Sequence, residues 1–339
     1  MTPDGNPDPE SALDERFRIA ASLVLEDRVD QIYSLSKGLL DVTDTAPADA
    51  MWPTARRLRA AIELFRPCFS KSQYRGVREE VRALTQSVGR RRDMDVAIDT
   101  VAGVGAEMGH AEQEGINRLI DRLRREQSDA NRVLAQSVNG RRMEAFRLRI
   151  EDLTDAAVRN PDDDGREVYQ PLVDIPESAR ELVQARLTRL RASAPGALDP
   201  DSVKDQHRMR VAAERLRYAL ELTAEGLGTQ AHTARRAARG LQEVLGEMRD
   251  CDVVLPEVRE QVRILEMEDV ATIFERARGN RDLDPILVQA SPNRAAYRGL
   301  ELLAVHLLAR RRIMFERFKR LWLEQSRQGV WVALETSLK

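Results

Sequence analysis

Arginine is the residue whose abundance and spacing point most directly to chemistry in this sequence. The chain of 339 residues carries 54 basic side chains, and only five of them are lysines, which leaves 49 arginines. A guanidinium group binds a carboxylate or a phosphate through two parallel hydrogen bonds, which an ammonium group does not. The 56 acidic residues bring the net charge to −2, which argues against a general nucleic-acid binder and still allows one focused arginine cluster. GC-rich codon usage together with arginine–glutamate pairs on helix surfaces is the alternative explanation.

One segment, beginning near Val203, predicts a helix with a basic face. At about 100° per residue, one arc carries His207, Arg210, Glu214, Arg217 and Glu221. The opposite arc carries Met209, Ala212, Ala213, Leu216 and Leu220. The pattern predicts a buried apolar stripe and a face of cationic groups. The alternative is an exposed helix on which Glu214 and Arg217 pair with each other.

An Arg-Asp-x-Asp-Val element occurs twice, at residues 92–96 and 249–253. A pair of aspartates can hold magnesium beside a phosphate, which would suit a metal-dependent phosphohydrolase using Asp93, Asp95, Asp250 and Asp252. Positions i and i+2 of a helix diverge by about 200°, so the carboxylates converge only where the chain turns. We therefore favour a structural role, in which each aspartate caps a helix or pairs with a nearby arginine. Basic runs also occur at 141–142 and 310–312.

Signals for catalysis are scarce. The sequence has no Gly-x-Ser-x-Gly elbow, no Walker loop and no dinucleotide fingerprint. Its four histidines and two cysteines lack metal-ligand spacing. We therefore predict a binding protein rather than an enzyme, with no cofactor and no metal.

The elements that must position these residues are helices. Strand signals are nearly absent, whereas apolar residues recur at i, i+3, i+4 and i+7, so the fold class is predicted to be all-α. The predicted helices span residues 12–40, 49–67, 72–109, 111–137, 140–159, 177–193, 201–224, 230–249, 251–278 and 292–323, with a final turn at 328–337. No apolar run is long enough to cross a membrane and the first ten residues do not form a secretory signal, so we expect a cytoplasmic protein.

Two pairs of segments indicate an internal duplication. Residues 57–64 resemble 215–222 at an offset of 158, and residues 89–96 match 246–253 at an offset of 157. We predict a disordered N-terminus (1–11), a first repeat (12–159), an acidic linker (160–176) and a second repeat (177–339). In the first repeat, Asp49 and Trp52 occupy the positions of His207 and Arg210, and Pro53 predicts that this helix starts later than its counterpart.

The segment from His207 to Arg217 resembles the His-x-x-Arg-Val-Ala run of the CHAD family, the conserved-histidine α-helical domain. The paired Arg-Asp-x-Asp-Val elements are similar to its second hallmark. The resemblance covers nearly the whole chain, from about residue 12 to 339. It implies two tandem four-helix bundles related by a pseudo-two-fold, with a basic groove or pore between them. Glu214 departs from the family, in which a basic residue is common at that position.

The resemblance further implies that the protein binds inorganic polyphosphate without turning it over, in the cytoplasm and at polyphosphate granules. The phosphate-binding residues it implies are His207, Arg210 and Arg217 in the second repeat, Arg56 and Arg59 in the first, and also Arg92, Arg249, Arg142 and Arg311. Aromatic residues make up only 4% of the chain, which leaves few base-stacking platforms and argues against a specific nucleic-acid partner. A helical scaffold for an acidic protein partner is a further alternative. The oligomeric state is left open.

Overall fold

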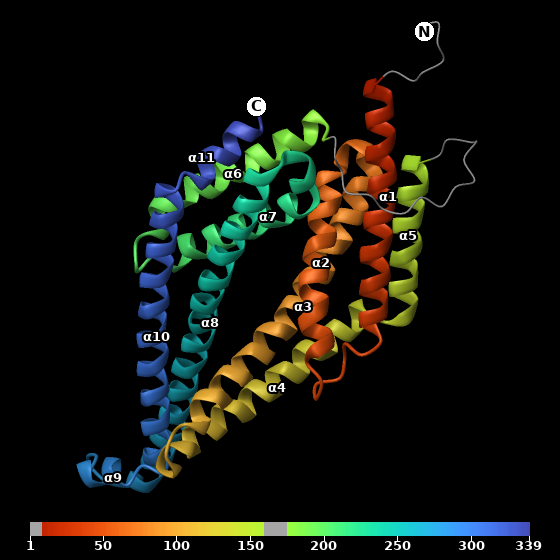
Figure 1. Ribbon diagram of the computed structural model, residues 1–339. Helices are drawn as coiled ribbons and strands as arrows, with labels where there is room; N and C mark the ends of the chain where they lie inside the picture. Colours follow the sequence, from red (N-terminus) through yellow and green to blue (C-terminus); the bar gives the residue numbers. More distant parts are fainter. Residues whose placement is uncertain (1–8, 159–174) are drawn as a thin grey trace, which may run out of the picture. The chain divides into compact units, whose positions relative to one another are not determined.

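A computed structural model describes residues 9–158 and 175–339, and the side chains of 15–155 and 175–339 (Figure 1). The described residues are all-α and contain no strand, as predicted. The α-helices are α1 (Pro9–Ser36), α2 (Ala46–Leu64), α3 (Lys71–Ala106), α4 (Gln113–Ser137), α5 (Gly140–Val158), α6 (Glu177–Ala197), α7 (Val203–Leu227), α8 (Thr229–Ala277), α9 (Pro285–Gln289), α10 (Arg294–Arg327) and α11 (Val330–Ser337). Residues 1–8 of the N-terminus predicted at 1–11 and residues 160–174 of the linker predicted at 160–176 lie outside the described residues, and residues 9–11 belong to α1. None of the described helices combines the length and the apolar character that crossing a membrane requires.

The chain forms two compact units, and each unit takes segments from both halves of the sequence. Unit 1 comprises Met1–Arg92, Asn131–Leu245 and Phe318–Lys339, and unit 2 comprises Asp93–Ala130 and Gly246–Arg317. The long helices α3, α4, α8 and α10 therefore contribute residues to both units. The boundaries proposed for the two sequence repeats remain predictions.

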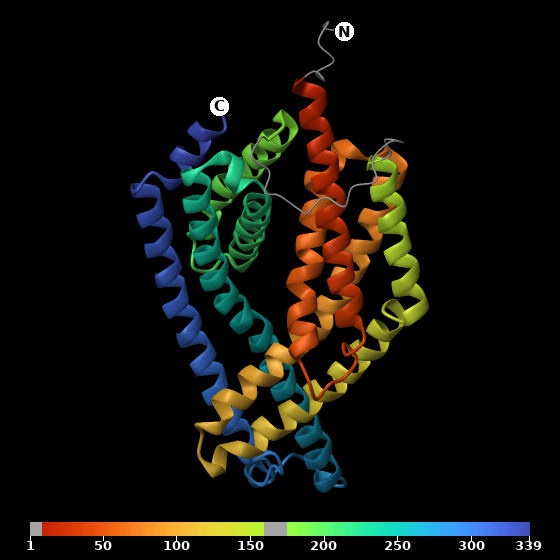
Figure 2. The ribbon, with the colours of Figure 1, turned by 45° about the vertical axis from the view of Figure 1, so that its right-hand side comes forward.

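Unit 1 buries the apolar stripes of its amphipathic helices against one another. Helix α1 packs between α2 and α5, and α6 lies along α7 (Figure 2). Leu25 on α1, Leu58 on α2 and Leu216 on α7 are fully buried. Since burying a leucine side chain contributes roughly 1.5–3 kcal/mol, such stripes dominate the stability of this unit. Burial of these stripes fixes which face of α2 and of α7 carries the polar residues.

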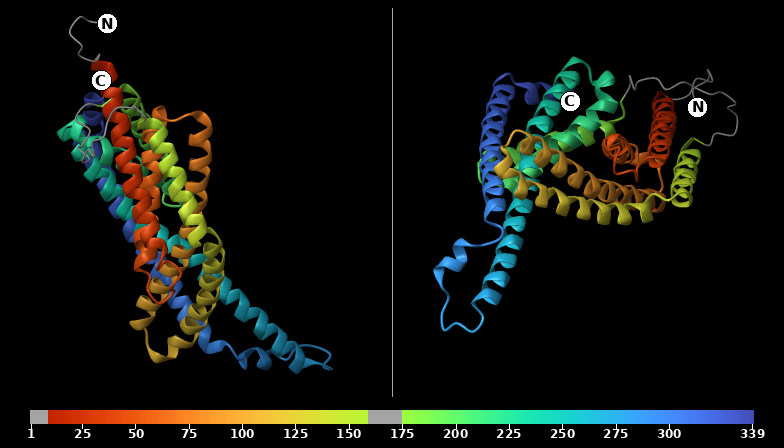
Figure 3. Two further views of the ribbon diagram at one scale, coloured as in Figure 1. Left: turned by 90° about the vertical axis from the view of Figure 1, so that its right-hand side faces the viewer. Right: turned by 90° about the horizontal axis from the view of Figure 1, so that it is seen from below.

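Unit 2 is a separate core in which two helices approach closely. Its buried apolar residues come from the second half of α3, from α4, α8 and α10, and include Leu119, Val254 and Leu303. A Cβ atom on Gly115 would lie 2.0 Å from the carbonyl oxygen of Ala296, so the contact between α4 and α10 requires glycine there. The end of α8, α9 and the start of α10 form a hairpin (Figure 3).

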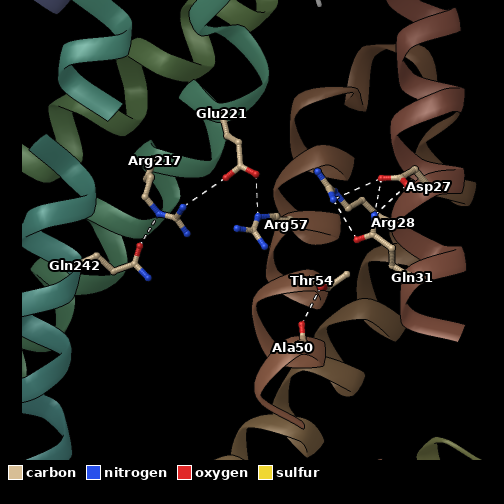
Figure 4. Close-up of polar contacts among 9 residues, drawn as sticks. All are labelled: Asp27, Arg28, Gln31, Ala50, Thr54, Arg57, Arg217, Glu221 and Gln242. Carbon is tan, nitrogen blue, oxygen red and sulfur yellow. Dashed lines mark hydrogen bonds and ion pairs between the residues drawn. The ribbon is translucent and has the colours of Figure 1, made fainter. Parts of the chain in front are cut away.

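Two helix predictions were wrong. The helices expected at 230–249 and 251–278 form one continuous helix, α8, which continues through Gly246 and Pro256 without a break. Helix α2 starts at Ala46, which corresponds to position 204 at the offset of 158 and so lies within one residue of the start of α7; Pro47 is in its first turn, and Pro53 lies inside the helix and does not delay its start. Pro53 costs one backbone hydrogen bond, and beside it the Thr54 hydroxyl donates to the carbonyl of Ala50 at 2.8 Å (Figure 4).

Candidate functional site

The polar face of α7 is covered by α2 in unit 1. The apolar stripe predicted for α7 is buried, as expected. Arg210 and Glu214, which the helical period assigns to the opposite face, are also buried, with 7% and 5% of their surfaces exposed. Helix α2 packs against α7 and turns its own arginines toward this face. Charged groups buried in this way must be paired, and their partners define the site.

The first buried cluster joins Arg56, Glu214 and Arg210. Arg56 of α2 forms an ion pair and a hydrogen bond with the Glu214 carboxylate, and Nη1 of Arg210 lies 3.3 Å from the same oxygen. Arg56 and Glu214 occupy equivalent positions at the repeat offset of 158. One carboxylate therefore holds two guanidinium groups at the place where the equivalent helices meet.

A second cluster has Glu221 at its centre (Figure 4). Arg57 Nε donates to Glu221 Oε1 at 2.8 Å, and Nη1 of Arg217 lies 3.5 Å from Oε2 of the same carboxylate. Arg217 Nε donates to the side-chain oxygen of Gln242 at 2.7 Å. Glu221 therefore joins α2 to α7 in the same manner as Glu214.

Glu63 occupies the position in α2 that Glu221 occupies in α7. Nε of Arg59 lies 3.4 Å from Glu63, four residues along the same helix, as Arg217 does with Glu221. Arg186 of α6 forms a further ion pair with Glu63. Each of these glutamates thus binds two arginines, and the arrangement recurs at equivalent positions of the two helices.

Two arginines contact the ring of Trp52, the residue that occupies the position of Arg210 in the first repeat. The guanidinium carbon of Arg56 lies 3.7 Å from the ring centroid of Trp52, and that of Arg92 lies 4.7 Å from it. Arg92 also pairs with Asp49 at 3.1 Å. The face of an indole ring attracts cations. Arg92 of α3 therefore places a positive charge beside Trp52, at the position where the second repeat has Arg210.

Two arginines of this region have lowered pKa values. Burial, followed by the positive charge of Arg210, lowers the pKa of Arg56 from 12.5 to about 9. Burial also lowers the pKa of Arg215, with Glu63 opposing the shift and Arg59 adding to it. With a pKa of about 9, Arg56 remains charged at pH 7. The positive charge is incompletely compensated, so an added anion would be stabilised here.

The repeated aspartates of unit 2 are engaged with side chains. Asp252 accepts from Arg311 Nε at 2.5 Å, Asp93 lies 3.9 Å from Arg249, and Asp95 accepts from Gln127 at 2.5 Å. Both elements lie inside continuous helices, so neither caps a helix, and pairing with arginine is confirmed for Asp93 and Asp252. Across the described part of the chain, no three His, Cys, Asp or Glu side chains gather as a metal site would require.

The structure brings together five of the nine predicted binding residues. Arg56, Arg59, Arg92, Arg210 and Arg217 lie on α2, α3 and α7 of unit 1. His207 is exposed near the start of α7, and Arg142 is exposed in the first turn of α5, where its amide donates to Asn139. Arg249 and Arg311 belong to unit 2.

Sequence reasoning missed three residues at this contact: Arg186, Arg215 as a lining residue, and Tyr218. Tyr218 follows Glu214 by four residues, so the same helical arc carries both side chains. This spacing is the signal in the sequence that marks Tyr218. Arg186 lies on α6, where no sequence pattern linked it to α2.

Comparison with known proteins adds a family and a fold. The model of the CHAD domain matches residues 23–259. The crystal structure of the CHAD domain from the plant Ricinus communis is 20% identical, with a TM-score of 0.55, covering 95% of this chain and 91% of that one. PptA from Streptomyces chartreusis is 16% identical, with a TM-score of 0.57, covering 90% and 98%. No curated protein matches the sequence.

Proposed function

The chain belongs to the CHAD family, and we propose that it binds inorganic polyphosphate, without turning it over, at the contact between α2 and α7 in unit 1. The observation that carries the proposal is the buried excess of arginine at this contact. Arg56 and Arg210 share the single carboxylate of Glu214, and Arg57 and Arg217 share that of Glu221. A polyanion would complete the charge balance.

Polyphosphate suits such a surface because it carries about one charge per phosphate and no base to stack. Its recognition requires cations and hydrogen-bond donors, which arginine provides in a fixed planar fork. Single-stranded nucleic acids add a demand for aromatic platforms. Arg56 and Arg92 contact the ring of Trp52, so its faces are taken by cations and do not offer a platform for bases. The proposed setting is the cytoplasm, at polyphosphate granules.

The test is a binding assay that compares long-chain polyphosphate, DNA and RNA at matched charge and salt. We expect polyphosphate to bind at micromolar concentration or better, with an affinity that falls steeply as salt rises because counterions are released. The double substitution Arg56→Gln with Arg59→Gln should weaken binding at least about a hundredfold, since each arginine–phosphate contact contributes about 1.5–3 kcal/mol. Equal affinity for all three polymers would contradict the proposal.

The matched control is Arg236→Gln with Arg239→Gln. Both arginines are exposed on the part of α8 that belongs to unit 1, so the control removes the same charge from the same unit. Polyphosphate affinity should change by less than about twofold, because exposed charges contribute little individually. Incubation with magnesium should release no orthophosphate from polyphosphate. Release of orthophosphate would instead favour the phosphohydrolase alternative.

A further inference from the structure

A small hollow opens between α2, α3 and α7 within unit 1. Its volume is about 70 Å³. Its lining residues are Arg56, Arg59, Ala60, Glu63, Thr85, Val211, Glu214, Arg215 and Tyr218. About 10–15 Å³ of such space holds one water molecule, so the hollow has room for a few waters or for one tetrahedral oxyanion.

Tyr218 lines this hollow and carries a hydroxyl group that has no hydrogen-bond partner among the described residues. Only 3% of the Tyr218 surface is exposed. Its ring is held by Arg217, whose guanidinium carbon lies 4.2 Å from the ring centroid. A buried hydroxyl without a partner costs about 1–3 kcal/mol, so an acceptor bound in the hollow would recover that free energy.

The charges around the hollow favour an anion as that acceptor. Two carboxylates line it, those of Glu63 and Glu214. Five guanidinium groups surround these carboxylates: Arg59 and Arg186 at Glu63, Arg56 and Arg210 at Glu214, and Arg215 in the lining. Arg215 has neither a hydrogen bond nor an ion pair with any of the described side chains, and its burial lowers its pKa. The region is therefore positive although glutamates contribute to it.

We propose that this hollow binds a single phosphate group, with Arg56, Arg59 and Arg215 supplying the charge and the Tyr218 hydroxyl donating a hydrogen bond. The inference rests on the proposed function and deepens it. The hollow is an end site that takes the terminal phosphate of a polyphosphate chain, while Arg57, Arg92 and Arg217 contact phosphates further along. Free inorganic phosphate has the same chemistry and would occupy the same hollow.

The probes are inorganic phosphate, polyphosphate of defined length with free ends, and the same polyphosphate with both terminal phosphates esterified. Calorimetry should give one inorganic phosphate per chain. Tyr218→Phe should weaken phosphate binding about tenfold, the value of one hydrogen bond to a charged group. Arg215→Gln should weaken it at least as much, and Tyr33→Phe, which removes a hydroxyl elsewhere in unit 1, should leave it unchanged.

The two polyphosphate probes then show whether the hollow binds the terminal phosphate of a chain or only free inorganic phosphate. A free-ended chain should lose affinity in Tyr218→Phe, and an esterified chain should bind both proteins equally. Inorganic phosphate that binds the wild type and Tyr218→Phe with equal affinity would overturn the inference, even where Arg56→Gln with Arg59→Gln still weakens long-chain binding as expected. Tyr218-dependent phosphate binding without polyphosphate binding would instead support the hollow and refute the proposed function.

Discussion

The two least exposed arginines of unit 2, Arg122 and Arg311, each have carboxylate partners of their own, whereas the arginines at the α2–α7 contact of unit 1 outnumber the carboxylates that hold them. In unit 2, Arg122 lies within 2.9 Å of both Glu126 and Glu257, and Arg311 pairs with Asp252. In unit 1, the carboxylates at this contact come from Glu63, Glu214 and Glu221, and the guanidinium groups from Arg56, Arg57, Arg59, Arg186, Arg210, Arg215 and Arg217. A matched arginine stabilises the fold, and an unmatched one remains available to an anion.

The comparison can be tested most severely at Arg311, one of the predicted binding residues. Arg311 and Asp252 are 13% and 10% exposed, so Arg311→Leu would leave a buried carboxylate without its arginine. We expect the free energy of unfolding to fall by about 3 kcal/mol, and the folded fraction to bind polyphosphate as the wild type does. Denaturant unfolding and binding at low temperature measure the two effects.

Arg310→Leu is the control, because Arg310 pairs with Glu247 at 3.6 Å and both side chains are 36% exposed. Its cost in stability should be less than about 1 kcal/mol. A folded Arg311→Leu protein that no longer binds polyphosphate would show that a matched arginine also binds the ligand, which would remove the distinction between the two units.

Glu214→Gln tests the same comparison, because we expect it to increase polyphosphate affinity rather than to reduce it. The Glu214 carboxylate holds Arg56 and Arg210 and therefore competes with phosphate for them. The amide should raise polyphosphate affinity about fivefold, since it removes one negative charge from a partly buried site, and the salt dependence of binding should steepen. Weaker binding would mean that the carboxylate organises the arginines rather than competing for them.

Glu247→Gln is the equivalent change in unit 2. Glu247 also lies between two arginines, at 3.6 Å from Arg310 and 3.7 Å from Arg317. We expect polyphosphate affinity to stay within twofold of the wild type, because these partners do not belong to the proposed site. An equal gain in both variants would indicate a general effect of net charge.

Substitution of Trp52 should have a smaller effect on polyphosphate affinity, because the ring positions two of the arginines. Trp52→Leu removes the ring that Arg56 and Arg92 contact, and we expect polyphosphate affinity to fall about threefold, in line with about 0.5–1 kcal/mol for an exposed cation–π contact. Trp52→Phe should retain most of the affinity. In the wild type, polyphosphate should change the fluorescence of Trp52. A signal that Trp52→Phe leaves unaltered would come from Trp322 or Trp331 instead.

The fold was largely predictable from sequence because helical periodicity is local. The stripe of α7 that includes Met209 and Leu216 is buried as predicted. The continuity of α8 was missed: two helices divided at position 250 were predicted, whereas one helix runs from Thr229 to Ala277. Helix bounds elsewhere moved by a few residues, as expected where capping alone decides them.

The candidate site was predictable only in part. Periodicity assigned Arg210 and Glu214 to a polar face, but it carries no information on what that face contacts, so their burial against α2 was not foreseen. The role of Trp52 depends on Arg92 reaching it from another helix. Tyr218 is recognised only by its lack of a partner, which is a property of the packed structure.

Arg249 offers the smallest and most discriminating change, because its equivalent at the repeat offset is Arg92. Arg92 contacts Trp52 in unit 1, whereas Arg249 is 39% exposed and lies 3.9 Å from Asp93 in unit 2. Arg92→Gln should weaken polyphosphate binding about threefold, and Arg249→Gln by less than about twofold, since an exposed pair contributes little. Titration of both variants at one salt concentration makes the comparison. Losses of equal size would show that polyphosphate contacts both units, and that the matched arginines of unit 2 give up their carboxylates to bind it.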